Sequence, residues 1–309
     1  MMMKSLFASG FLALLFSIFA GIFLYFTELL PPEPVTTAAA DSNIQIDACA
    51  KESRTFTGRT RTDGTVPILT YHRIVEESDL SSRHMIDGKV NQMIVTKEEF
   101  EKQIAFLKEE GFTSLTLPEL HEFLVNKQEI PKRSVVITFD DGYKDNVTEA
   151  YPILKKYGFQ AASFLIAGMI TAEDRPFTPE YVQYASTKEL SSACTVFSYY
   201  SHTFDFHHRK GSSMEDEKSF LITEDANAIK KDLAKSIGVL KGESLAFAYP
   251  YGEYSPKSIR ILKELGTSMA FTTEERDASQ ADHLYELPRH SVFYDTTMTK
   301  FRSIFKPHH

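Results

Sequence analysis

The 309-residue sequence contains no tryptophan and only two cysteines, Cys49 and Cys194. Two cysteines are too few for a disulfide scaffold or for a zinc site made of four cysteines. The thiols could pair in an oxidising compartment, but their separation along the chain does not decide this. We therefore expect two unpaired thiols, with one disulfide as the alternative.

Positive charge is also scarce. The chain has 34 Lys and Arg residues against 42 Asp and Glu residues, which gives a net charge of -8 at pH 7. Proteins that bind nucleic acid need a basic face toward the phosphates, so we expect no nucleic-acid partner. The motifs G-x-G-x-x-G and G-x-x-x-x-G-K-[ST] are absent. A nucleotide-binding fold would therefore lack its phosphate loop.

One long uncharged apolar run is present, from Ser5 to Phe26. About 20 such residues span a bilayer as a helix, whereas a cleavable signal has an apolar region of about 7–15 residues. We therefore expect residues 1–30 to be a cytoplasmic start followed by an uncleaved transmembrane signal-anchor. The catalytic bulk would then lie outside the cell membrane. The alternative is cleavage near Ala38–Ala40, which would give a secreted protein associated with the cell surface.

The remaining chain divides into a linker and one large domain. Residues 31–65 are rich in Pro, Thr, Ala, Ser and Asp, and we interpret them as an extracellular linker. In residues 66–309, short apolar runs alternate with amphipathic helices. The predicted strands are 66–71, 134–139, 161–166, 196–200, 245–249, 269–272 and 287–293, and the predicted helices are 97–110, 118–125, 146–157, 226–240 and 256–265. Such alternation indicates an α/β fold with a parallel sheet, here a distorted or incomplete (β/α) barrel of about seven or eight strands.

Chemistry in such barrels takes place at the carboxyl ends of the strands, and two carboxylates lie at one of these ends. Asp140 and Asp141 follow the strand 134–139, and Gly142 can turn the chain so that both face one pocket. One carboxylate could bind a metal while its neighbour removes a proton from water. The alternative is a pair that caps the following helix.

Three histidines follow the strand 196–200: His202, His207 and His208. His202 and His207, together with a carboxylate, would form a two-histidine, one-carboxylate metal site with open positions. Zinc is the expected metal, and cobalt, nickel, manganese or iron would also suit these ligands. His208 is the alternative second ligand.

Other strand ends carry further candidates. The turn Tyr249-Pro250-Tyr251-Gly252 could present a backbone N–H to an oxyanion, and His72 could act as an acid. Arg289 and His290 lie on the last strand, where they could brace a carboxylate or donate a proton.

Taken together, these motifs resemble the NodB-type polysaccharide deacetylases, carbohydrate esterase family 4. The resemblance rests on Ile137–Tyr143, the His202 to His207 segment and Ala248–Gly252, and it extends over roughly residues 67–293. The five-residue spacing of the two histidines and the upstream Tyr71-His72-Arg73 are similar to the subgroup that deacetylates poly-β-1,6-N-acetylglucosamine.

The resemblance implies a role for each candidate. Asp140 matches the general base, and Asp141, His202 and His207 match the metal ligands. The Tyr251 N–H matches the oxyanion donor. His72 matches the general acid of the subgroup, with His290 as the second choice. Because the chain has no tryptophan, the Asp-x-x-Asp-Trp motif of many members is missing, and the residue that orients Asp140 is not identified.

The expected substrate is an extracellular N-acetylglucosamine polymer, namely the β-1,6-linked polymer of a biofilm matrix. Proteins of exopolysaccharide synthesis or export would be further partners. One alternative is the same chemistry on peptidoglycan, chitin oligomers or a peptide amide. Another is a non-catalytic sugar-binding module, but loss of Asp140 or of a metal ligand would mark such a module, and these residues are intact.

Overall fold

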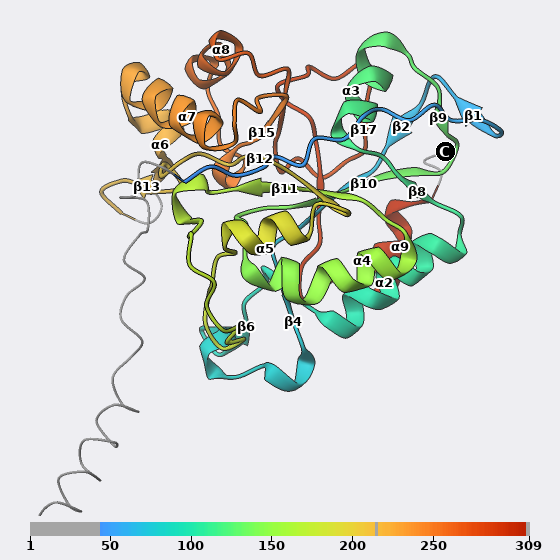
Figure 1. Cartoon of the computed structure of the whole chain (residues 1–309), viewed down its shortest axis with the longest axis horizontal. Helices are drawn as coiled ribbons and strands as arrows, with labels where there is room; N and C mark the ends of the chain where they lie inside the picture. The colour runs from blue at the N-terminus through green and yellow to red at the C-terminus, as the bar shows by residue number, and fades with distance from the viewer. Residues whose placement is uncertain (1–43, 214–215, 307–309) are drawn as a thin grey trace, which may run out of the picture. The chain divides into compact units, whose positions relative to one another are not determined.

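The computed structural model describes residues 44–213 and 216–306 (Figure 1). Its centre is a parallel sheet in the order β16-β15-β12-β11-β10-β3-β18, with β8 paired to β10. The strands are β3 (Ile68–Tyr71), β8 (Thr113–Ser114), β10 (Ser134–Phe139), β11 (Ala161–Leu165), β12 (Phe197–Ser201), β15 (Ala246–Ala248), β16 (Met269–Phe271) and β18 (His290–Ser291). The predicted α/β class and parallel sheet are confirmed.

The sheet curls so that its two ends approach through the segment 287–291. Leu287 forms an isolated bridge with Phe271 of β16, and β18 pairs with β3 in parallel. The predicted strand 287–293 is therefore too long, because the chain leaves one edge and joins the other within this segment. Between the two pairings, the N–H of Arg289 bonds to the carbonyl of Glu274 instead of a strand partner.

Apolar strands and covering helices form the core. Every residue of β10 is buried, as expected for a parallel strand that is covered on both faces. Helices α2 (Lys97–Glu109), α4 (Tyr151–Tyr157) and α9 (Met298–Ile304) lie together on one side, and α7 (Ala226–Val239) packs beside α8 (Pro256–Glu264) (Figure 1). The remaining larger helices are α3 (Leu117–Asn126) and α5 (Thr187–Ser192).

The predicted helix starts are largely correct. The side chain of Thr96 accepts a hydrogen bond from the N–H of Glu99, and Ser255 caps α8 ahead of Pro256. The predicted helix 146–157 is interrupted, because its first turn, Asn146–Ala150, is a π-helix that leads into α4. The first turn of α4 includes a proline, which has no N–H to continue an α-helical ladder.

Residues 44–65, which the sequence assigned to the linker, pack on the domain. Ile46 is 1% exposed, and its N–H bonds to the carbonyl of Val239 at the end of α7. Arg54 forms an ion pair with the buried Glu119 of α3. The segment then crosses to β1 (Thr60–Arg61), which pairs with β9 (Ile130–Pro131) (Figure 1). The linker prediction is wrong for residues 44–65, because their apolar and charged side chains find buried partners that lie far away in the sequence.

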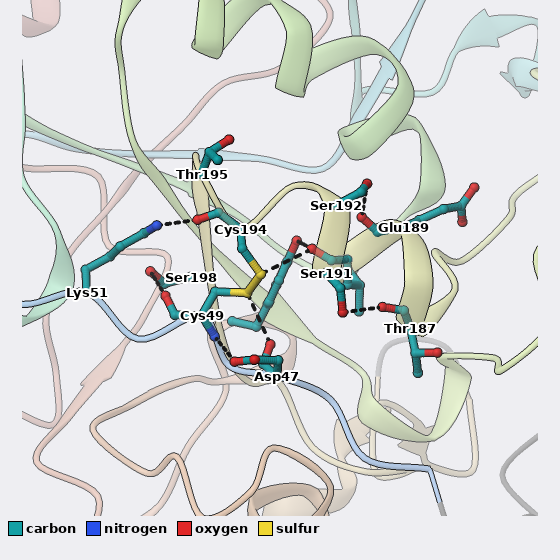
Figure 2. Close-up of a disulfide and its surroundings, with 12 residues drawn as sticks. Asp47, Cys49, Lys51, Thr187, Glu189, Ser191, Ser192, Cys194, Thr195 and Ser198 are labelled. Atoms are coloured by element: carbon teal, nitrogen blue, oxygen red, sulfur yellow. Dashed lines mark hydrogen bonds between the residues drawn. A yellow bond between two sulfur atoms is a disulfide. The ribbon is translucent and has the colours of Figure 1, made fainter.

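Cys49 and Cys194 form a disulfide, so the expectation of two unpaired thiols is wrong (Figure 2). Their Cα atoms lie 5.3 Å apart, across a sequence separation of 145 residues. Hydrogen bonds also fix the backbone of both cysteines. The Lys51 ammonium donates to the carbonyl of Cys194, and the Ser198 hydroxyl donates to the carbonyl of Cys49. The disulfide therefore ties the N-terminal segment to the turn between α5 and β12.

We expect the double variant Cys49→Ser/Cys194→Ser to lose about 2–5 kcal/mol of unfolding free energy, because a cross-link over a long loop restricts the unfolded chain. Denaturant unfolding with circular dichroism would measure this loss. Wild-type protein in excess reductant is the control and should match the variant. Equal stability of the oxidised wild type and the variant would show that the bond adds nothing to the fold.

The predicted membrane segment Ser5–Phe26 lies outside the described residues. Within 44–213 and 216–306, no helix is both long enough and apolar enough to cross a bilayer.

Candidate active site

Two carboxylates diverge from the carboxyl end of β10. The N–H of Asp140 continues the pairing with β3 by bonding to the carbonyl of Tyr71. Asp141 then has a positive φ of 74°, an uncommon conformation for a residue other than glycine. Gly142 follows with φ 82°, and a Cβ at this position would lie 2.7 Å from the Leu165 side chain. This tight turn sends the two side chains to different partners.

The side chain of Asp141 meets the two predicted histidines. The Oδ1 atom of Asp141 lies 3.5 Å from Nε2 of His202 and 3.3 Å from Nε2 of His207. Zinc bonds of about 2.0–2.1 Å at tetrahedral angles place ligand atoms about 3.3–3.4 Å apart. The Asp141 oxygen is thus spaced from both histidine nitrogens as metal ligands would be.

The surroundings of these atoms also fit a cation. Oδ1 of Asp141 is buried, and none of the residues that the structure describes donates a hydrogen bond to it. Such an arrangement is costly for a carboxylate unless a cation compensates it. Nδ1 of His202 lies 2.8 Å from the carbonyl of Ala248, which leaves Nε2 for a metal. Burial lowers the pKa of His202 to about 4, so the imidazole is neutral near pH 7, as ligation requires.

The third histidine of this segment points elsewhere. The ring of His208 is 59% exposed and faces Asp205 at 3.8 Å. The alternative that His208 is the second ligand is therefore not supported. Among the residues that the structure describes, the group suited to a metal is Asp141, His202 and His207.

Asp140 forms a buried, two-pronged ion pair with Arg289. The two guanidinium nitrogens Nη1 and Nη2 donate to Oδ1 and Oδ2 of Asp140, both at 2.8 Å. Arg289 is fully buried, and its Nε donates to the carbonyl of Thr272. Burial alone would raise the pKa of the Asp140 carboxyl, but the charge of Arg289, with smaller contributions from His202 and His72, holds this pKa well below its usual range. Arg289, which the sequence indicated as a residue that could brace a carboxylate, thus orients Asp140.

The two candidate acids lie in different environments. His72 follows β3 directly, beside Asp140 in the strand register, and its carbonyl accepts a hydrogen bond of 2.6 Å from the Asn146 amide. His290 follows Arg289, and successive side chains of a strand point to opposite faces. Its Nε2 accordingly lies 2.8 Å from Oδ1 of Asp277. The structure thus brings His72, and not His290, to the side of the sheet that holds Asp140.

The turn after β15 brings Tyr251 to the histidines. Pro250 is buried, and Tyr251 has a φ of 60°. The Tyr251 hydroxyl donates to the carbonyl of His207 at 3.2 Å, and the two rings lie 4.7 Å apart. The role of the Tyr251 N–H as an oxyanion donor remains a prediction.

One buried charge near the site was missed from the sequence. Asp232 of α7 accepts hydrogen bonds from the N–H groups of Phe204 and Asp205, between His202 and His207. Its position in the predicted helix could have indicated this role, since Asp232 lies on the buried stripe with Ile229 and Leu233. An acidic residue on an apolar stripe needs a polar partner.

Comparisons with known proteins agree with this fold. Residues 127–270 match the family model described as polysaccharide deacetylase. The poly-β-1,6-N-acetyl-D-glucosamine N-deacetylase of Staphylococcus aureus is 30% identical over 228 residues, which cover 72% of this chain and 76% of that protein.

Solved structures show the same architecture. The deacetylase PplD of Streptococcus pyogenes, in complex with acetate, has a TM-score of 0.67 at 26% identity, and the match covers 79% of this chain and all of that one. IcaB of Ammonifex degensii has a TM-score of 0.62 at 24% identity, with 81% and 97% of the two chains covered, and shares the fold. The fold and the matches define an enzyme that acts on N-acetyl groups. This chain belongs to the polysaccharide deacetylase family.

Proposed function

We propose that this protein hydrolyses N-acetyl groups of poly-β-1,6-N-acetyl-D-glucosamine with the help of a divalent metal, zinc in the first place. The metal is supported by two histidine nitrogens that converge on a buried Asp141 oxygen, which accepts no hydrogen bond within the described part of the chain. The linkage is supported by the S. aureus deacetylase, which is named for that polymer.

Hydrolysis of an amide needs an activated water, a stabilised oxyanion and a proton for the leaving nitrogen. A divalent cation held by Asp141, His202 and His207 would lower the pKa of water and polarise the acetyl carbonyl. Asp140, kept ionised and oriented by Arg289, accepts the proton of the water at a carboxylate oxygen.

The other residues of the site act on the acetyl group and its leaving nitrogen. The Tyr251 N–H donates to the carbonyl oxygen as negative charge develops on it. The water oxygen becomes bonded to the acetyl carbon, and the C–N bond breaks. His72 then protonates the nitrogen, which leaves as the free amine, and acetate is released.

One assay tests both parts of the proposal. Acetate release would be measured from β-1,6-linked and β-1,4-linked N-acetylglucosamine oligomers, with and without chelator. We expect turnover of the β-1,6 oligomers, loss of turnover with chelator, and recovery with Zn²⁺, Co²⁺ or Ni²⁺. Preference for the β-1,4 oligomers would instead indicate peptidoglycan or chitin, and full turnover by protein shown to be metal-free would exclude the metal.

His72→Ala should reduce deacetylation by about 10²–10⁴-fold with the metal retained, because the leaving amine loses its acid. The high-pH limb of the rate profile should change with it. His290→Ala is the matched control and should cost much less, since His290 is bonded to Asp277. Rates and zinc content of both variants would be compared. An active His72 variant beside an inactive, metal-loaded His290 variant would assign the acid to His290.

We further propose that Ser5–Phe26 anchors the protein in the cell membrane with the catalytic domain outside. The disulfide supports this location, because disulfides form and persist in oxidising compartments. The full chain should therefore fractionate with membranes and be cleaved by protease added to intact cells. N-terminal sequencing that found a mature start at Asp41 would favour the cleaved, secreted form. An exopolysaccharide synthesis or export system is the partner we would test by co-purification from such membranes.

A further inference from the structure

The loop that carries both histidine ligands is held from two sides. From one side, the N–H groups of Ala167 and Gly168 donate to the carbonyls of Thr203 and Phe204, at 3.0 and 2.8 Å. Contact is close here, since a Cβ on Gly168 would lie 2.5 Å from the Phe204 oxygen. These bonds satisfy two carbonyls of the loop, and its N–H groups need partners of their own.

Helix α7 supplies those partners from the other side. Oδ2 of Asp232 accepts from the N–H of Phe204 at 2.9 Å, and Oδ1 accepts from the N–H of Asp205 at 2.8 Å. One turn further along α7, the hydroxyl of Ser236 lies 2.7 Å from that of Ser201 at the end of β12. A single carboxylate thus binds two successive N–H groups between His202 and His207.

The loop requires this support because its backbone is strained. Thr203 is fully buried and has a φ of 80°, where a β-branched residue is a rare outlier. Such a conformation persists only when the surrounding structure enforces it. His202 begins the loop next to β12, but His207 lies at its far end, so its position depends on the path of the chain between them.

We propose that Asp232 is a positioning residue for the metal ligands: its carboxylate sets the path of residues 203–206 and thereby places Nε2 of His207 opposite Nε2 of His202. The inference rests on the proposed metal site. It predicts that a change in helix α7, which contributes no ligand, alters metal binding.

The test compares two variants of the same helix. Asp232→Asn keeps the size of the side chain but places an NH₂ group against a backbone N–H, so one of the two bonds is lost. The control is Asp225→Ala, because Asp225 lies at the start of the same helix and caps it by accepting from the N–H groups of Asn227 and Ala228. The control should lower the melting temperature of the domain, because it weakens the start of α7, without moving the histidines.

Zinc affinity would be measured by competition with a chromophoric chelator on full chains that were first stripped of metal. We expect the zinc dissociation constant to rise about 10–100-fold in Asp232→Asn and to stay within about twofold of wild type in Asp225→Ala. The visible spectrum of the Co²⁺ form should change in the first variant only, since it reports the geometry of the ligands.

Two results would overturn the inference while leaving the proposed function standing. One is an unchanged zinc affinity and Co²⁺ spectrum in Asp232→Asn. The other is a metal-free Asp232→Asn chain without a cooperative melting transition, which would assign the residue to folding rather than to positioning. Absence of zinc binding by the wild-type chain would instead reject the proposed function together with this inference.

Discussion

His202→Ala is expected to bring both bound zinc and acetate release to the detection limit. His202 is 2% exposed, and the neighbouring His208 is not placed to replace its Nε2, since His208 faces Asp205. A site left with Asp141 and His207 has fewer protein ligands than the three of catalytic zinc sites. Metal content by elemental analysis and acetate release would be measured on the same preparation.

His208→Ala is the matched control for that variant. It removes an imidazole from the same segment, but one that is exposed and lies outside the ligand group. Zinc content and activity should both stay near wild type. If His208→Ala lost its metal while His202→Ala retained it, the ligand assignment would have to be reversed.

Asp140→Asn should produce the opposite combination, with metal retained and deacetylation reduced by about 10²–10⁴-fold. The amide cannot accept a proton from water, but Asp140 is not placed among the ligand atoms, so the metal site stays whole. Rate and zinc content would again be measured together. Loss of zinc in this variant would indicate that Asp140 is a ligand and not the base.

The same variant should also be less stable, because Arg289 is fully buried and would lose its counter-charge. Removing one partner of a buried ion pair costs about 3–5 kcal/mol. Asparagine keeps one acceptor oxygen for the guanidinium. We therefore expect the free energy of unfolding to fall by an amount near the lower end of that range. Asp295→Asn is the control, since Asp295 forms an exposed pair with Lys300 and should change neither rate nor stability appreciably.

The local part of the site was predictable because it depends on short-range signals. The strand before Asp140 is β-branched and aromatic, and the histidines follow a second apolar strand. In a parallel sheet, the carboxyl ends of the strands meet at one edge, so these side chains were expected to lie together. The structure places Asp141, His202 and His207 in one group, as predicted.

Helix starts were predictable for the same reason. The bonds between Thr96 and Glu99 and between Ser255 and Ser258 join residues three positions apart. Capping of this kind depends on side chains within a single turn. The stretch from Asn146 was less regular than predicted, since a π-helix precedes α4.

Long-range partners were decided by the tertiary structure alone. Arg289 binds Asp140 across 149 residues, and the disulfide joins residues 145 apart. No periodicity or spacing encodes such pairs. The same holds for residues 44–65, whose polar composition indicated a linker although Ile46 and Cys49 have buried places on the domain.

The sequence by itself determined the α/β class, the parallel sheet and the residue types at its strand ends, because periodicity and strand boundaries are properties of neighbouring residues. Tertiary structure decided which of those residues share a face. In the folded chain, Arg289 contacts Asp140 and His290 contacts Asp277. His207, and not His208, lies beside Asp141. The physical reason is that a side chain's direction depends on strand register and loop path, and both are set by packing against segments far away in the chain.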